Sequence, residues 1–361
     1  MNPQLDNIKS AASPPTHMFM EAAEAADAIA RMLDRNATVV DQLAARLRAV
    51  PPAFVVTCAR GSSDHAATFA KYAIEMQLGV VTASASPSIA SLYASTPHLA
   101  GALYLAISQS GRSPDLIRSA SAARAAGAFV VAMVNAEGSP LAAVAEVVIP
   151  LHAGTEASVA ATKSYVCALA AILDLVARWK HDAGLAHAVS ALPELLHAAW
   201  RADWSALSAG LTEPHNLFVL GRGLGFGIAL EAALKLKETC YLWAEPYSTA
   251  DFHHGPIALV EEGTPVLAYI LPGHAFTNMI QTADTLGARG ADLVVFGTVP
   301  PQARVHAAVP LPERFGSQEI PESLTPLVAI VAGQIFACEL ALARGYDPDQ
   351  PRGLTKITRT L

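Results

Sequence analysis

Short apolar runs, most of them bounded by glycine, alternate along the chain with longer alanine-rich stretches. Two of these runs are AFVVTC, which begins at Ala53, and LYLAIS, which begins at Leu103. Continuous apolar runs of this kind are typical of strands in a parallel sheet that is covered on both faces, and the stretches between them indicate helices. The pattern therefore predicts an α/β fold made of βαβ units.

The same pattern occurs twice. Three segments have counterparts: AFVVTCARGSS (53–63) resembles NLFVLGRGLG (216–225), LYLAISQSG (103–111) resembles VLAYILPG (266–273), and AAGAFVVAMV (125–134) resembles ARGADLVVFG (288–297). Corresponding glycines keep their spacing, with 162 positions from Gly61 to Gly223 and 162 from Gly111 to Gly273. A register held over several segments predicts two tandem copies of one domain.

We divide the chain into four predicted parts on this basis. They are an N-terminal helical arm over 1–34, a first domain over 35–195, a second domain over 196–345 and a C-terminal tail over 346–361. The stretch Trp179–Pro214, which links the copies, is expected to be mostly helical. The tail has no clear periodicity and reads as a loose extension.

The most apolar run is Leu327–Ala343, and it contains Gln334 and Glu339. It falls short of a clean membrane span of about 20 residues. We therefore expect a helix that is buried in the core or at a subunit contact.

Composition narrows the class of protein. The chain has 361 residues, of which 52% are hydrophobic and 15% charged, and a formal net charge of -7 without a basic tract. Nucleic acid and anionic membrane are therefore not expected as partners. The four cysteines are far apart, which fits a reducing cytoplasm and argues against a zinc site. The first residues lack the apolar core of a signal peptide.

Polar side chains gather where the run from Leu103 ends. Ser108 is its last residue, Gln109 and Ser110 follow directly, and Ser113 can cap the next helix, with Pro114 at the first helical position. Hydroxyls around free N–H groups at a helix N-terminus make an anion site of the size of a phosphate. The turn Gly61–His65 (GSSDH) bears two further serines, and two such turns that face each other would hold one phosphate. The alternative is that both are ordinary serine and glycine turns.

The second copy has LPGHAF at the corresponding place, without serine. Neither loop fits the nucleotide P-loop, and Phe226 stands where a dinucleotide fingerprint needs glycine. The sequence thus predicts a phosphate site in the first copy, no nucleotide P-loop, and at most weak support for a dinucleotide cofactor.

A predicted helix after Gly223 carries Glu231, Lys235 and Glu238 on one face. This face is either a solvated ion-pair face or the rim of a cleft, where a carboxylate can serve as a base. The loop FHHGP adds His253 and His254, either as structural residues or as an acid–base group, and no further zinc ligands accompany them.

Taken together, these motifs resemble those of one family, the isomerase half of glutamine–fructose-6-phosphate aminotransferase (glucosamine-6-phosphate synthase). The resemblance runs from about His17 to the C-terminus. It depends on six motifs: HMFMEAAE, SQSGRS, AGTEASVAATKSY, ALEAALKLKE, HHGPIAL and DPDQPRGLTK. It implies two tandem sugar isomerase (SIS) domains, each a parallel sheet flanked by helices in a three-layer, flavodoxin-like αβα arrangement.

The resemblance also implies roles for single residues. The family's phosphate contacts fall on Ser63, Ser108, Gln109, Ser110 and Ser113, and Val159 matches a position that contacts the sugar through its backbone. Glu238 matches the base that moves a proton between C1 and C2, and Lys235 the lysine that assists it. His254 matches the ring-opening histidine, which the neighbouring subunit supplies. Lys356 matches the Schiff-base lysine in a tail that folds over the site. No metal or organic cofactor is implied.

Three departures bear on the substrate. The family's synthase carries an N-terminal glutaminase domain, which we do not expect here, and His253 and Asp251 stand where the family has lysine and glutamate. The resemblance then implies a homodimeric enzyme that converts glucosamine 6-phosphate to fructose 6-phosphate and ammonia. Alternatives are a deglycase or isomerase of another hexosamine or fructosamine 6-phosphate, a synthase subunit without a glutaminase, and a sugar-phosphate sensor without turnover.

Overall fold

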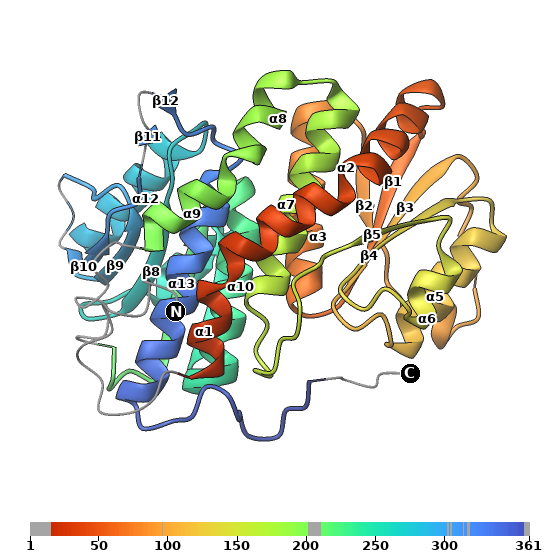
Figure 1. Ribbon diagram of the computed structural model, residues 1–361. Coiled ribbons are helices and arrows are strands. Elements are labelled where there is room, and N and C mark those ends of the chain that lie inside the picture. The colour runs from red at the N-terminus through yellow and green to blue at the C-terminus, as the bar shows by residue number, and fades with distance from the viewer. Residues whose placement is uncertain are drawn as a thin grey trace, which may run out of the picture.

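A computed structural model describes residues 16–95, 97–200, 211–301, 303, 305–312, 314–315 and 318–356. It contains two five-stranded sheets in which all neighbouring strands are parallel (Figure 1). The first sheet has the order β2 (Thr82–Ser84), β1 (Phe54–Cys58), β3 (Ala102–Ser108), β4 (Phe129–Val134), β5 (Val147–Pro150). The second has the order β10 (Val305–Val309), β9 (Asp292–Gly297), β8 (Pro265–Ile270), β6 (Asn216–Gly221), β7 (Trp243–Ser248).

The two sheets have the same topology. Counted within each copy, both follow the order 2-1-3-4-5, which is the flavodoxin-like order. The correspondence extends to the backbone, because Gly61 before α3 (Ser62–Leu78) has φ 55° and ψ -135°, while Gly223 before α10 (Leu224–Cys240) has φ 58° and ψ -129°. The predicted α/β fold with two tandem copies is confirmed.

Helices cover both faces of each sheet. The outer faces carry α5 (Pro114–Ala125) and α6 (Pro140–Val144) on the first sheet and α12 (Phe276–Ala288) on the second. Between the sheets lie α3, α7 (Lys163–Lys180), α10 and α13 (Thr325–Ala343) (Figure 1). The remaining elements are α1 (His17–Ala23), α2 (Ala25–Ala49), α4 (Ser88–Ser91), α8 (Ala183–Ser190), α9 (Leu192–Trp200), α11 (Thr249–His253), η2 (Pro256–Leu259) and the hairpin β11 (Arg314–Phe315), β12 (Gln318–Glu319).

The two copies meet where α3 packs against α10. A Cβ added to Gly227 on α10 would lie 3.0 Å from the carbonyl oxygen of His65 and 3.2 Å from the Cβ of Phe69, both on α3. Glycine at this position therefore permits a close approach of the two helices. The hydroxyl of Tyr165 on α7 donates a hydrogen bond to the carbonyl of Gly227 at the same crossing.

The apolar run Leu327–Ala343 is the greater part of α13. Among the helices that the structure describes, α13 is the only one long and apolar enough to cross a membrane. However, 83% of its most apolar 18-residue window is buried inside the protein. It packs against α10, and the buried amide of Gln334 donates to the carbonyl of Thr162. Of the two expected locations, the structure gives this helix a place in the core.

The C-terminal tail is not loose up to Lys356, contrary to expectation. The carboxylate of Asp349 accepts hydrogen bonds of 2.7 Å from the backbone N–H groups of His17 and Met18, which begin α1. The guanidinium of Arg352 lies 3.9 Å from the ring centre of Tyr241. No local sequence pattern predicts either contact, because each joins the tail to a segment far away in the sequence.

The segment that links the copies is helical through α8 and α9 up to Trp200, whereas its last residues, 211–214, are described as non-helical. The predicted domain limits at 34/35 and 195/196 fall inside α2 and α9, respectively. Both of these limits stay predictions.

Candidate active site

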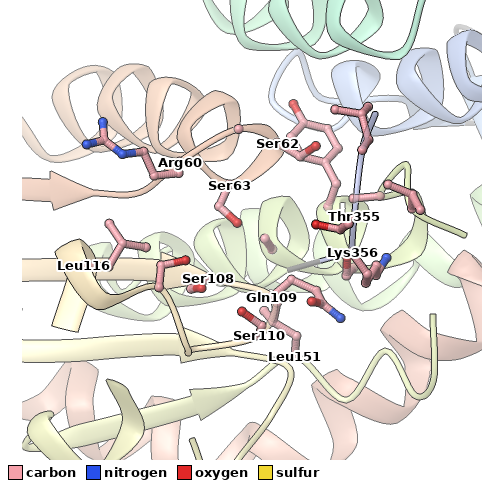
Figure 2. A pocket seen from close by; sticks show the side chains of 18 of the residues that line it. Arg60, Ser62, Ser63, Ser108, Gln109, Ser110, Leu116, Leu151, Thr355 and Lys356 are labelled. Atoms are coloured by element: carbon pink, nitrogen blue, oxygen red, sulfur yellow. The ribbon is translucent and has the colours of Figure 1, made fainter. Parts of the chain in front are cut away.

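A pocket of about 200 Å³ opens beyond the carboxyl ends of β1 and β3 (Figure 2). This is the edge at which open α/β sheets bind ligands. Residues of both copies and of the tail line it, namely Arg60, Gly61, Ser62, Ser63, Ser108, Gln109, Ser110, Ser113, Leu116, Leu151, Val159, Ala161, Ser164, Tyr165, Ala168, Glu238, Leu354, Thr355 and Lys356. Eight of the ten residues that the sequence singles out therefore meet in one cavity.

The turn after β3 is shaped by its own hydroxyls. Ser108 Oγ accepts from the N–H of Gly111 at 3.1 Å, and Ser110 Oγ accepts from the N–H of Arg112 at 3.3 Å. Gly111 has φ 61°, and a Cβ there would lie 2.1 Å from Ser139 Oγ, so this turn requires glycine. The result is a compact loop that leads straight into α5.

Ser113 differs from its predicted role as a capping residue. It occupies the N-cap position of α5, with Pro114 next, but within the described chain its side chain makes no capping hydrogen bond. A capping side chain bonds the second or third helical N–H, and here Asp115 Oδ1 takes the third, that of Leu116, at 2.9 Å. The Ser113 hydroxyl consequently remains available to the pocket.

The turn Gly61–His65, which begins α3, faces the loop Ser108–Ser113 after β3. These two segments are called the serine turns. Figure 2 shows the Ser63 side chain pointing toward the loop that carries Ser108 and Ser110, while the guanidinium of Arg60 points away from that loop. Arg60 Nε donates to Asp115 Oδ2 at 3.0 Å, and the Asp115 side chain is fully buried. This ion pair, which sequence reasoning missed, fixes the two serine turns relative to each other.

The charged face of α10 is buried, so the alternative of a solvated ion-pair face is wrong. Lys235 Nζ lies 2.6 Å from Glu238 Oε2 and 3.4 Å from Glu231 Oε1, and it donates to Ser62 Oγ at 3.3 Å. The side chains of Lys235 and Glu231 are fully buried, whereas that of Glu238 is 19% exposed and reaches the pocket. Burial alone would lower the pKa of Lys235, but the two carboxylates outweigh it and raise the pKa. Lys235 is therefore an ammonium at neutral pH.

Lys356 enters the pocket as one half of an ion pair. Its Nζ donates to Glu156 Oε2 at 2.9 Å and to the carbonyl of Ser158 at 2.6 Å. Glu156 also accepts from the N–H groups of Thr162 and Ser164 and from the Ser164 hydroxyl. Burial would raise the pKa of Glu156, but the charge and hydrogen bond of Lys356 and the bonds from Ser164 lower it. Glu156 was missed in the sequence, although it is the one acidic residue in AGTEASVAATKSY.

The histidine loop lies elsewhere in the same chain. His254 follows α11, its Nδ1 lies 2.7 Å from the carbonyl of Ala250, and it lies outside the residues that line the pocket. His253 Nε2 lies 3.1 Å from Thr282 Oγ1. The chain thus brings Lys235, Glu238 and Lys356 to the serine turns but does not bring its own His254 there.

The corresponding turn of the second copy is occupied by a carboxylate of the chain itself. Glu322 Oε1 accepts from the N–H of His274 at 3.0 Å, and Oε2 lies 2.6 Å from His274 Nδ1. This hydrogen bond and the charge of Glu322 raise the pKa of His274. A Cβ on Gly273 would lie 2.2 Å from Glu322 Cδ. An internal anion therefore fills the loop in which the second copy lacks serine.

Metal ligands are not gathered at either site. Across the described residues, no three His, Cys, Asp or Glu side chains are placed to hold a metal ion. The four cysteines are buried free thiols.

The chain therefore combines a duplicated flavodoxin-like sheet with a serine-lined pocket at the ends of its strands. The family model of the SIS domain matches residues 54–178 and 210–303, which cover most of both sheets, and the chain belongs to this family.

Relatives with longer chains extend the comparison. The glutamine–fructose-6-phosphate aminotransferase (isomerizing) of Thermococcus kodakarensis is 36% identical over 266 residues, which are 70% of this chain and 43% of that protein. The chain spans about half the length of the curated relatives that it matches, between 43% and 52% of those from T. kodakarensis, Pyrococcus horikoshii and Streptomyces coelicolor.

Two solved structures match over nearly their whole length. A candidate phosphosugar isomerase from Silicibacter pomeroyi DSS-3 is 42% identical with a TM-score of 0.86, and the match covers 93% of this chain and 100% of that one. The glucosamine-6-phosphate deaminase of Thermotoga maritima shares the fold, with a TM-score of 0.74 and 20% identity over 96% of this chain and 100% of that one. The chain is thus a relative of phosphosugar isomerases and of the isomerase half of the aminotransferase.

Proposed function

We propose that the protein is a glucosamine-6-phosphate deaminase that forms fructose 6-phosphate and ammonia. The observation that supports this most is that the serine turns, Glu238 and Lys356 line one pocket, with the buried Lys235 paired to Glu238 behind its wall. Phosphate, a migrating proton and a carbonyl are the three features of such a substrate that a protein must handle. Each of these groups suits one of them.

The phosphate binds between the two serine turns. The hydroxyls of Ser63, Ser108, Ser110 and Ser113 and the amide of Gln109 donate to its oxygens, assisted by the positive end of the α5 dipole. Val159 contacts the sugar through its backbone. Most of the binding energy comes from this end of the substrate and positions C1 and C2 at Glu238.

The proton transfer then runs through Glu238. In the open-chain aldehyde the Glu238 carboxylate removes the proton from C2, which gives an enolamine, and returns a proton to C1. Lys235 stabilises the negative charge that develops on the adjacent oxygen. The product is an imine at C2, and addition of water there releases ammonia and leaves the ketone of fructose 6-phosphate.

Lys356 serves the carbonyl end of the reaction. After its ammonium has lost a proton, the amine condenses with the C2 ketone of fructose 6-phosphate to a Schiff base and one water, and hydrolysis of this Schiff base releases the ketose and restores the lysine. Glu156, which lies 2.9 Å from Lys356 Nζ, is the carboxylate nearest to that proton among the described contacts of Lys356.

Ring opening requires a histidine that the pocket of one chain does not contain. We assign it to His254 of a second copy, so the functional unit is a homodimer with its active sites near the subunit contact. The position of His254 outside the pocket of its own chain is the observation that supports this assignment.

A second candidate is suggested by the aminotransferase relatives. The same site can run toward glucosamine 6-phosphate when another protein or a further domain supplies ammonia. A deglycase or isomerase of another hexosamine or fructosamine 6-phosphate would use the same serine turns, and a sensor would need those turns alone.

One assay separates these candidates. The purified protein is incubated without glutamine with glucosamine 6-phosphate, other hexosamine and fructosamine 6-phosphates, and unphosphorylated glucosamine, and ammonia is measured. Deamination predicts ammonia from glucosamine 6-phosphate and almost none from glucosamine. Turnover of another member of the panel alone would identify a different substrate, and binding without turnover would favour a sensor.

A further inference from the structure

We propose that His65 is a positioning residue. It donates a hydrogen bond to Glu231, the other carboxylate that neighbours Lys235 on α10, and thereby keeps Lys235 at Glu238. This inference rests on the proposed function, because it concerns the base of that reaction. His65 is not among the residues that line the pocket, so it acts through its neighbours and not on the substrate.

The contact crosses from one copy to the other. His65 lies on α3, and its Nδ1 is 2.8 Å from Glu231 Oε2 on α10. The Glu231 side chain is fully buried, and that of His65 is 18% exposed. Since a carboxylate paired with an ammonium can only accept, Nδ1 of His65 carries the hydrogen in this bond.

The ammonium of Lys235 lies closer to one of its two neighbouring carboxylates than to the other. Lys235 Nζ is 2.6 Å from Glu238 and 3.4 Å from Glu231. A buried carboxylate needs hydrogen-bond partners, and without them its desolvation is costly. His65 provides one to Glu231, which leaves the ammonium free to approach Glu238. Without His65, Lys235 would be the one partner left among the described contacts of Glu231, and it would move toward Glu231.

The same residue links the base to the phosphate turn. His65 lies one helical turn after Ser62 and two residues after Ser63, which both line the pocket. Ser62 Oγ accepts from Lys235 Nζ at 3.3 Å. The close approach at Gly227 keeps α3 and α10 at a fixed separation. His65 therefore fixes the position of the serine turn at the start of α3 relative to α10, the helix that carries Glu238.

Two substitutions of His65 distinguish the effect of its hydrogen bond from the effect of its size. Asparagine can place its Nδ2 donor where Nδ1 of histidine lies, whereas leucine has a similar size and no donor. We expect His65→Leu to lower kcat for glucosamine 6-phosphate by about 100-fold, the effect of a misplacement of catalytic groups by about 1 Å. KM should change little, because the serine turns are intact. His65→Asn should recover most of kcat.

Two controls accompany this comparison. Thr68→Val on the same helix removes a hydroxyl whose one bond within the described residues is to the carbonyl of Asp64, and it should leave both constants unchanged. Binding of 2-amino-2-deoxyglucitol 6-phosphate, an open-chain analogue that cannot react, should be unaffected in all variants. A His65→Leu variant with wild-type kcat, or a His65→Asn variant as slow as His65→Leu, would overturn the role of His65.

If the His65→Leu chain does not fold, nitrogen NMR of the wild-type His65 ring tests the same contact. We expect a hydrogen on Nδ1, and a ring protonated only on Nε2 would overturn the inference. Failure of the wild type to release ammonia contradicts the proposed function instead. That result is read before any variant is made.

Discussion

The ammonium of Lys235 lies 2.6 Å from Oε2 of Glu238, one turn further along α10, and the Lys235 side chain is fully buried. Glu238 alone of the three charged residues on this face reaches the pocket. A carboxylate at a cavity wall beside a fixed positive charge is suited to receive a proton and to return it. This pair is the centre of the proposed chemistry.

Replacing Glu238 by glutamine removes the proposed base and keeps its size. Binding should survive because the serine turns are untouched, while kcat falls by about 100- to 10,000-fold, the contribution of general acid–base catalysis. Steady-state kinetics with glucosamine 6-phosphate measure both constants. Glu245→Gln changes an exposed carboxylate on β7 and should leave both unchanged. A Glu238→Gln enzyme with wild-type kcat would assign the base to another group.

The serine turns should control KM. Ser110→Ala and Ser113→Ala each remove a donor to a charged phosphate, a bond that contributes about 1.5–3 kcal/mol. We therefore expect KM to rise by about 10- to 100-fold in each variant. Ser121→Ala is the matched control, because Ser121 lies on the exposed side of α5 and its hydroxyl donates to the carbonyl of Ile117, its one bond in the part of the chain that the structure describes. An equal effect of all three substitutions would argue against a phosphate site.

The Glu156–Lys356 pair should make the stability of the protein depend on pH. Glu156→Gln leaves Lys356 without its buried carboxylate and should lower the free energy of unfolding by about 3 kcal/mol at pH 7. Because the pKa of Glu156 is lowered in the folded protein, its stabilising charge is present above its ordinary pKa of 4.5 and is lost as the pH falls through the folded value. The difference between wild type and variant should narrow below pH 4.5. Urea unfolding at several pH values measures it, and a constant difference would contradict the ion pair.

Shared active sites predict complementation between two inactive variants. Mixing Glu238→Gln with His254→Ala chains produces dimers in which one site has both native residues. Such a mixture should regain roughly a quarter of the wild-type activity if subunits exchange at random. Ammonia release after co-refolding measures this recovery. A mixture that stays inactive, or a monomer that is fully active, would contradict the assignment of His254 to a second copy.

The sequence predicts the sheets well because their signal is local. Apolar runs between glycines fix the strands, and the repeat of Gly61 at Gly223 fixes the duplication, down to nearly equal backbone angles. The serine turns are predicted for the same reason, since they follow directly on strands. Ser62 and Ser63 are consecutive in one turn, and Ser108, Gln109 and Ser110 are consecutive in the other.

Contacts between distant segments could not be predicted from these patterns. Arg60 and Asp115 are 55 positions apart, and His65 and Glu231 are 166 apart, so no periodicity connects them. The docking of Asp349 on the first N–H groups of α1 depends on the end of the chain returning to its beginning. The carboxylate of Glu322 in the second copy's loop is of the same kind. Such pairs become visible only when the chain is folded, whether they join the two copies or lie within one of them.

The most direct measurement of the central claim is turnover of glucosamine 6-phosphate in deuterated water, without glutamine, with ammonia and sugar products analysed together. We predict one ammonia for each fructose 6-phosphate formed, and deuterium at C1 of the ketose, because the proton that Glu238 returns has exchanged in part with solvent. Incomplete labelling is expected where transfer is internal. An aldose and a ketose phosphate that interconvert with no ammonia would contradict the deaminase and identify a plain isomerase.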